Sequence, residues 1–175
     1  MPFLKKALKN NKGFTIIELL VTLSILTVIS GMMIVYSRGG ERQLLLIKEQ
    51  TEIANAITRA KSLAIQGFEV ENICGYGVHF YQEPTGNGGF DISSYEDCGN
   101  FDPPSRKVYQ SNTLDPRVKF TAFFSDVIFM PPDPEVSFNP QVGIDPRVIE
   151  INSTSLDFYP LQIKINGAGQ ISTTQ

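Results

Sequence analysis

The chain has 175 residues, about the length of one domain, which excludes a large multidomain enzyme. Hydrophobic residues make up 42% and charged residues 19%, a composition that excludes a disordered chain. The formal net charge of −3 hides an asymmetry. Four of the 15 basic side chains lie in the first 13 residues, which hold no acid; the rest of the chain has 11 basic and 18 acidic side chains.

The first long element follows this basic leader. Phe14–Tyr36 (FTIIELLVTLSILTVISGMMIVY) is apolar apart from small and hydroxyl residues and the single charge of Glu18. A helix needs about 20 such residues to cross a bilayer. The run is longer than the apolar region of a cleaved secretory signal, and the small residue Gly13 precedes it rather than following it. The pattern predicts a transmembrane helix with residues 1–13 in the cytoplasm and the C-terminal side exported.

Glu18 is the exception within this segment. A carboxylate at the centre of a membrane helix costs about 2.5–3.5 kcal/mol, and intramembrane charges usually have a partner. One interpretation places Glu18 near the membrane interface, where it reaches water and headgroups. The other requires a positive charge beside it within the membrane.

Lys12–Leu20 (KGFTIIELL), together with the leader and the apolar helix, closely resembles the processing and methylation signature of type IV pilin-like proteins. That family includes pilus subunits and the pseudopilins of type II secretion. The resemblance implies that a membrane-embedded prepilin peptidase cuts after Gly13, on the cytoplasmic side. Phe14 then becomes the N-methylated N-terminus. Glu18 pairs with the Phe14 amine of a neighbouring subunit, which supplies the missing partner for its charge.

The resemblance also implies a function. The chain is expected to be a structural subunit of a pilus-like or pseudopilus filament, with no enzyme activity, cofactor or metal. Its expected partners are other pilin or pseudopilin subunits, the prepilin peptidase/N-methyltransferase and an inner-membrane assembly platform. Its expected location is the inner (cytoplasmic) membrane, with a single span and the head outside the cytoplasm, and then the filament.

The next element, 37–67, is expected to be an amphipathic continuation of the helix. Gly39 and Gly40 each cost a helix about 1 kcal/mol relative to alanine, so a kink or break is expected there. Glu41–Gln66 contains no Pro or Gly, and Gly67 is a plausible stop. Apolar side chains at helical spacing predict one face that packs on a sheet: Leu44, Ile47, Ala54, Ile57, Ala60 and Ala64.

From residue 68 to 175 the pattern changes to short strands separated by turn signals. Strands are expected at Ile73–Tyr81, Arg117–Phe124, Val127–Met130, Val136–Phe138, Val148–Ile151, Leu156–Tyr159, Leu161–Ile165 and Gln170–Ser172. Gly86–Gly89 is expected to be a hairpin tip. The predicted fold class is α+β: a long N-terminal helix packed on an antiparallel β-sheet or small β-sandwich head, as in pilins.

Within the pilin-like family, the many short strands and the stretch Pro131–Phe138 look most like the H-type minor pseudopilin and related minor pilins. The type of filament stays open between a retractile pilus, a secretion pseudopilus and a competence apparatus. A second hypothesis keeps the same anchor but makes the chain a DNA- or substrate-binding minor pilin of a competence or secretion system. The acidic body argues against nucleic acid as a partner, because phosphate binding requires clustered Lys and Arg.

Cys74 and Cys98 are the only cysteines. Export would place them in an oxidising compartment, where an even count favours a disulfide. In the chain-entropy model, closing this loop stabilises the fold by about 3 kcal/mol. The alternative is two independent thiols.

Little else in the head points to chemistry. His79, the only histidine, lies in an expected strand and is interpreted as structural, because no nucleophile–base pair accompanies it. The acidic residues around Cys98 lack EF-hand spacing and are expected to form a solvated loop: Asp91, Glu96, Asp97 and Asp102.

Overall fold

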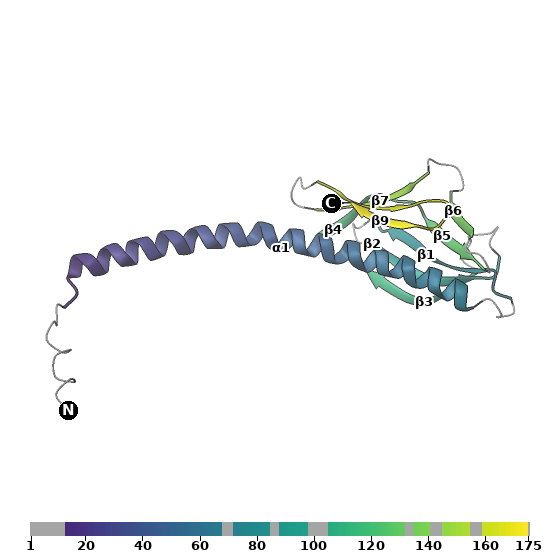
Figure 1. Ribbon diagram of the computed structural model, residues 1–175, viewed down its shortest axis with the longest axis horizontal. Helices are drawn as coiled ribbons and strands as arrows, with labels where there is room; N and C mark the ends of the chain where they lie inside the picture. The colour runs from purple at the N-terminus through teal and green to yellow at the C-terminus, as the bar shows by residue number, and fades with distance from the viewer. Residues whose placement is uncertain are drawn as a thin grey trace, which may run out of the picture. The chain divides into compact units, whose positions relative to one another are not determined.

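The computed structural model describes residues 13–67, 72–84, 88–97, 105–131, 135–140, 145–154 and 159–174 (Figure 1), without the side chains of 34–39. The chain divides into two compact units, Met1–Glu41 and Arg42–Gln175, which are described separately. One helix, α1 (Ile16–Gln66), contributes to both. It is helical through Gly39 and Gly40, so the expected melting at this pair does not occur.

The first unit is the N-terminal part of α1. In the window Ile16–Met33 the mean hydropathy is 2.1 and no residue is buried. Among the described residues, this is the one helix that is long and apolar enough to cross a membrane. Leucine, isoleucine and valine therefore cover its surface without any contact to a core of the chain.

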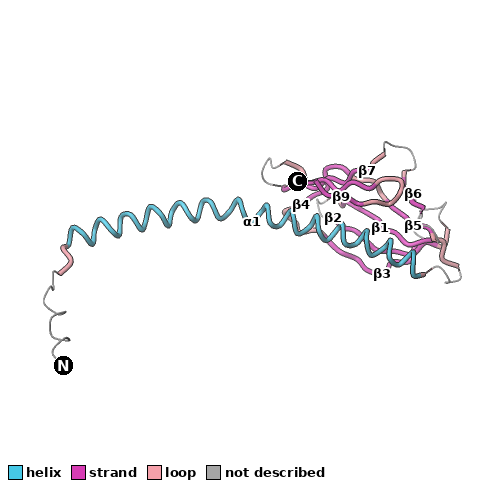
Figure 2. Tube along the Cα trace, viewed as in Figure 1, coloured by secondary structure: helices cyan, strands magenta, loops and turns pink. Residues whose placement is uncertain are grey.

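Within the described residues, the second unit contains the C-terminal part of α1 and nine strands in two antiparallel sheets (Figure 2). In the five-stranded sheet the order is β3-β2-β1-β5-β6. Its strands are β1 (Gly75–Gln82), β2 (Gly88–Tyr95), β3 (Arg106–Thr113), β5 (Asp126–Met130) and β6 (Glu135–Asn139). The four-stranded sheet has the order β4-β7-β8-β9. Its strands are β4 (Val118–Ala122), β7 (Arg147–Ser153), β8 (Leu161–Ile165) and β9 (Ile171–Thr174). The predicted α+β, pilin-like fold is confirmed.

Successive side chains of a strand point to opposite faces of the sheet, so every second side chain enters the core that the sheets share with α1. In β1 these are Tyr76, Val78 and Phe80, and in β8 they are the leucine and isoleucines of LQIKI. The helix supplies one buried face to both sheets: Leu46, Ile53, Ala56, Ile57, Ala60 and Ala64. Three alanines on this face let the helix approach the sheets closely.

The predicted stripe on α1 is wrong at Leu44, whereas Ile47 is partly buried and packs against the core as predicted. Ile57, Ala60 and Ala64 are buried, but Leu44 is 69% exposed and Leu46 is buried instead. The reason is that the buried face also contains two polar residues, Glu49 and Gln50, which hydrophobic spacing does not detect. Gln50 Nε2 donates to the carbonyls of Gln162 (3.0 Å) and Thr174 (3.2 Å), tying α1 to β8 and β9.

Most of the predicted strands form, and β8 has the predicted bounds. Two strands were missed, β2 (GGFDISSY) and β3 (RKVYQSNT), because their polar residues hide the alternation. Gly88 and Gly89 belong to β2 rather than to a hairpin tip, and a Cβ on Gly89 would lie 2.7 Å from the Asn112 carbonyl oxygen. The predicted strand Leu156–Tyr159 lies largely outside the described residues.

Candidate functional site

The residues that the sequence singles out for processing lie at the beginning of α1. Gly13, Phe14 and Thr15 precede the helix, which begins at Ile16. The Glu18 N–H donates to Thr15 Oγ1 at 3.3 Å, and the Leu19 N–H donates to the Thr15 carbonyl at 3.1 Å. Thr15 is therefore the N-cap of the helix, a role that threonine fills through its side-chain oxygen.

The T-x-x-E spacing of Thr15 and Glu18 is that of a capping box. Sequence reasoning did not use this signal, although the four residues contain it. Glu18 lies in the first turn, where the helix dipole favours a carboxylate. Among the residues that the structure describes, none forms an ion pair with this exposed carboxylate. The geometry thus fixes the backbone of Glu18 and leaves its side chain available to another molecule.

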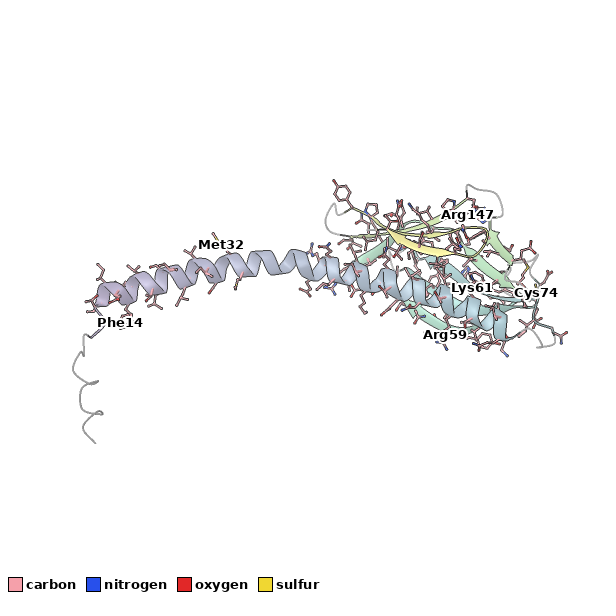
Figure 3. All side chains as sticks on the ribbon, viewed as in Figure 1. Phe14, Met32, Arg59, Lys61, Cys74 and Arg147 are labelled. Carbon is pink, nitrogen blue, oxygen red and sulfur yellow. The ribbon has the colours of Figure 1, made fainter. Side chains whose placement is uncertain are left out.

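The surface around Glu18 is apolar and uncovered. Phe14 is 75% exposed and Ile16 is 82% exposed, and Figure 3 shows Phe14 and Met32 projecting from this part of the chain. Three hydroxyls farther along α1 donate to carbonyls of their own helix: Thr22 to Leu19 (2.9 Å), Ser24 to Leu20 (2.7 Å) and Thr27 to Ser24 (2.8 Å). Such internal bonds satisfy polar groups that would otherwise be costly in hydrocarbon.

Comparison with known proteins agrees with this geometry. The chain has an α+β, pilin-like fold whose first described element is an exposed apolar helix. Residues 8–34 match the family model of the prokaryotic N-terminal methylation motif, which is the signature of type IV prepilins. Neither the curated proteins nor the solved structures give a match to the chain.

The two cysteines are only partly covered by the structure, because Cys98 lies outside the described residues. The N–H of Cys74 donates to the carbonyl of Tyr95 at 2.8 Å, next to the pair Gly75–Tyr95 that begins the β1–β2 ladder. This bond brings the chain three residues before Cys98 alongside Cys74. The disulfide remains a prediction, and the β1–β2 register is compatible with it.

His79 belongs to a polar cluster that sequence reasoning missed. Its Nδ1 lies 2.8 Å from Oδ1 of Asp126, a carboxylate that is 1% exposed. The Tyr95 hydroxyl donates to the same oxygen (2.9 Å), and Asn139 Nδ2 donates to Oδ2 (3.1 Å). Four strands, β1, β2, β5 and β6, thus meet at one carboxylate.

The electrostatics of this cluster follow from its hydrogen bonds. Burial alone would raise the pKa of Asp126, but the bonds from His79, Asn139 and Tyr95 outweigh it, so the pKa of Asp126 is lowered. Burial, followed by the neighbouring Asp126 charge, strongly raises the pKa of the Tyr95 hydroxyl. The cluster is a cross-strand tie, in keeping with the structural interpretation of His79.

The predicted acidic loop is wrong for Asp91, which lies in β2 opposite His79. Its Oδ1 is buried and has no hydrogen-bond partner in the part of the chain that the structure describes. Glu96 and Asp97 follow β2, and Asp102 lies outside the described residues. Within the described ranges, no three His, Cys, Asp or Glu residues are arranged to hold a metal ion.

Proposed function

We propose that this chain is a prepilin that is cleaved after Gly13, methylated on Phe14 and assembled as a structural subunit of a type IV pilus-like or type II secretion pseudopilus filament. One observation carries the proposal: an uncovered apolar helix begins at Ile16, inside the matched methylation motif, and its single carboxylate has no ion-pair partner among the described residues.

The local backbone supports cleavage at this position. Residues 13–15 are outside the helix, and the first helical residue is Ile16. A peptidase must reach the carbonyl of Gly13, and a helical hydrogen bond would compete for that group. The Thr15 cap keeps the helix from extending back through the bond between Gly13 and Phe14.

The same cap supports the proposed assembly contact. The Thr15 hydroxyl binds the backbone of Glu18, and no described residue binds its carboxylate, which is therefore left for an external cation. The Phe14 amine of a neighbouring subunit, newly created by cleavage, is a cation that is available within the membrane. Pairing the two charges offsets much of the cost of placing either in hydrocarbon.

The remaining parts of the proposal follow from the motif and the helix. We place the leader in the cytoplasm and residues 14–36, which include the beginning of α1, across the inner membrane. Residues 68–175 lie outside the cytoplasm as an exported head. The proposed partners are other pilin-like subunits, the prepilin peptidase and an inner-membrane assembly platform. The closest fit among subunit types is a minor pilin or H-type minor pseudopilin, for which the sequence resemblance is the support.

The test combines processing with assembly. In cells with an active prepilin peptidase, mass spectrometry of the extracted protein is expected to give an N-methylated Phe14 terminus. Glu18→Gln retains the shape of the side chain and removes its charge. It is expected to be processed normally but to enter the sheared filament fraction at least tenfold less efficiently.

Thr22→Ala is the matched control, because its hydroxyl binds only its own helix and its loss leaves the charge of Glu18 unchanged. This variant is expected to assemble like the parent protein. An intact Met1 terminus would contradict the processing step. Filament entry of Glu18→Gln at the parental level would contradict the assembly contact.

A further inference from the structure

Strand β7 ends in a polar pattern that has no role in the proposed filament contact. Glu150, Asn152 and Thr154 occupy every second position of the segment EINST. Because successive residues of a strand point to opposite faces of the sheet, Glu150 and Asn152 lie on the same face. Ile151 and Ser153, which alternate with them, are 0% and 7% exposed, so these two side chains point inward. Asn152 therefore projects from the outer face of the four-stranded sheet.

The surroundings of Asn152 are open to solvent. Its register partner in β4 is Lys119, whose side chain is exposed. The pairing of β7 with β8 ends one residue earlier, at Ile151. Thr154 is exposed directly after the strand, and its hydroxyl donates to the Arg117 carbonyl at 3.3 Å. A bulky group on the side chain of Asn152 would therefore lie at the margin of the sheet and outside the packed core.

The hydrogen bonds of this pattern leave one reactive atom available. Asn152 is partly exposed, and its Oδ1 accepts the Ser153 N–H at 2.7 Å. Glu150 is also partly exposed, and its Oε1 accepts a hydrogen bond from Gln162 Nε2 at 2.6 Å. Within the part of the chain that the structure describes, the amide nitrogen Nδ2 of Asn152 donates to no acceptor. This nitrogen is the atom of the pattern that another molecule can reach.

The same five residues carry the chemistry of a modification site. An asparagine that is followed two positions later by Ser or Thr, with no proline between, is an acceptor for N-linked glycans. Bacterial oligosaccharyltransferases also recognise a carboxylate two positions before the asparagine, and Glu150 supplies it. Asn152 is the only asparagine of the sequence that is followed by a hydroxyl residue at this spacing. The pattern thus contains all three groups by which such an enzyme selects its acceptor.

We propose that Asn152 is the acceptor of an N-linked glycan. Its Nδ2 forms a bond to C1 of the first sugar of a lipid-linked oligosaccharide, and one amide proton leaves. The bond between C1 and the pyrophosphate oxygen breaks, and the lipid pyrophosphate departs with the electron pair. This inference rests on the proposed export of residues 68–175, because the transfer takes place on the exported side of the membrane. It concerns the outer face of the head and not the assembly contact of Glu18.

The test produces the full-length chain in bacterial cells that contain a membrane oligosaccharyltransferase and its lipid-linked oligosaccharide. Trypsin releases residues 148–164 as one peptide, because no Lys or Arg lies between Arg147 and Lys164. Mass spectrometry of this peptide is expected to find the mass of the glycan on Asn152.

Substitutions separate recognition of the pattern from general effects on folding. Asn152→Gln is expected to carry no glycan on this peptide. Glu150→Gln and Thr154→Ala are each expected to lower the modified fraction at least tenfold, whereas Thr154→Ser retains the hydroxyl and stays modified. Asn112→Gln is the matched control, because Asn112 also lies in a strand but has Leu114 two positions after it. The control is expected to be modified like the parent protein.

An Asp-Gln-Asn-Ala-Thr extension after Gln175 distinguishes failure of this inference from failure of the proposed export. The cells used are ones that modify an exported reporter protein bearing the same extension. If the extension is modified and Asn152 is not, the head has been exported and the inference is overturned. If neither is modified, the head has not reached the exported side, so the proposed function fails and this inference fails with it. A glycan that persists on the peptide in Asn152→Gln also overturns the inference.

Discussion

At the scale of single residues, the carboxylate of Asp126 joins its own strand to three others. Its two oxygens receive three side-chain contacts from three other strands, with His79, Tyr95 and Asn139. Hydrogen bonds to a charged group contribute about 1.5–3 kcal/mol. We expect Asp126→Asn to lower the free energy of unfolding of the second unit by about 2–3 kcal/mol.

Differential scanning calorimetry of the full chain in micelles measures this loss. Glu135→Gln is the control, since it also removes one carboxylate charge, at an exposed site on β6. Equal stability of the two variants would contradict the assignment of Asp126 as a cross-strand tie.

The carboxylate of Asp126 also predicts that the stability of the second unit depends on pH. Because the pKa of Asp126 is lowered in the folded protein, the unfolded state binds the proton more readily. Its contribution to stability is present above the unfolded pKa of about 3.9 and is lost as the pH falls through the lower folded value.

The buried carboxylate of Glu49 has the opposite effect on how stability depends on pH. Among the described residues its Oε2 has no hydrogen-bond partner, and burial raises the pKa of Glu49. Its contribution is present below the unfolded pKa of about 4.3 and is lost as the pH rises through the folded value. Glu49→Gln is therefore expected to raise the melting temperature at pH 7 and to lose this advantage at pH 4 in the same calorimetric scans. A lower melting temperature at pH 7 would show that the Lys48 pairing outweighs burial.

The residues of the proposed processing site can be proposed from sequence because they lie close together in the chain. Gly13, Phe14 and Glu18 lie within six positions, and their pattern is readable without any tertiary contact. His79 and Asp126 are 47 residues apart and meet only through the pairing of β1 with β5. Strand registers of this kind depend on the whole sheet, so the sequence alone did not indicate the cluster.

At the scale of elements, α1 passes through Gly39 and Gly40 without a break, although glycine is a poor helix former. A Cβ added at Gly40 would meet no atom within 4 Å. Gly40→Ala is therefore expected to stabilise the local helix by about 1 kcal/mol. Amide exchange of residues 38–43 should slow by about fivefold, as measured by NMR in micelles.

Gly31→Ala is the matched control for this prediction. Its Cβ also has open space, but it lies more than two turns before the glycine pair, so exchange at 38–43 should not change. Unchanged amide exchange in Gly40→Ala would mean that opening of the helix does not limit exchange at residues 38–43, and it would contradict the prediction.

The strands β2 and β3 could not be predicted from the alternation of apolar residues. Ser93 and Ser94 are adjacent in β2 and both are buried, so apolar alternation is absent there. The edge strand β3 is polar on both faces, with exposed Val108 and Tyr109 at its bulge against β2. In contrast, LQIKI of β8 alternates strictly and was predicted with its correct bounds.

At the scale of the whole molecule, the change from a helical to a strand-rich pattern near Gly67 was sufficient to predict the α+β class. The division of the strands into two sheets was not predictable. β3 and β5, which precede and follow β4 in the sequence, belong to the five-stranded sheet, where β5 pairs with β1. β4 instead pairs with β7 in the four-stranded sheet. These pairings are decided by the shared core with α1 rather than by local sequence.

The proposed Cys74–Cys98 disulfide would stabilise the folded protein as a whole, because it restricts the unfolded chain. Reduction is expected to lower the stability of the second unit by about 3 kcal/mol, or its melting temperature by roughly 10 °C. Calorimetry with and without reductant measures the shift, and a Cys74→Ser/Cys98→Ser variant should show none. Alkylation of both thiols in the untreated protein would contradict the bridge.

The bond from Gln50 to the carbonyl of Thr174 joins residues 124 positions apart. The buried face of α1 is synthesised before β9, the strand that Gln50 ties to the helix. Non-local pairings of this length form late in folding, since the intervening chain must close first. The contacts that Gln50 makes with β8 and β9 therefore form only after the intervening chain has been synthesised and closed, later than the contacts of α1 with β1 and β2 become possible.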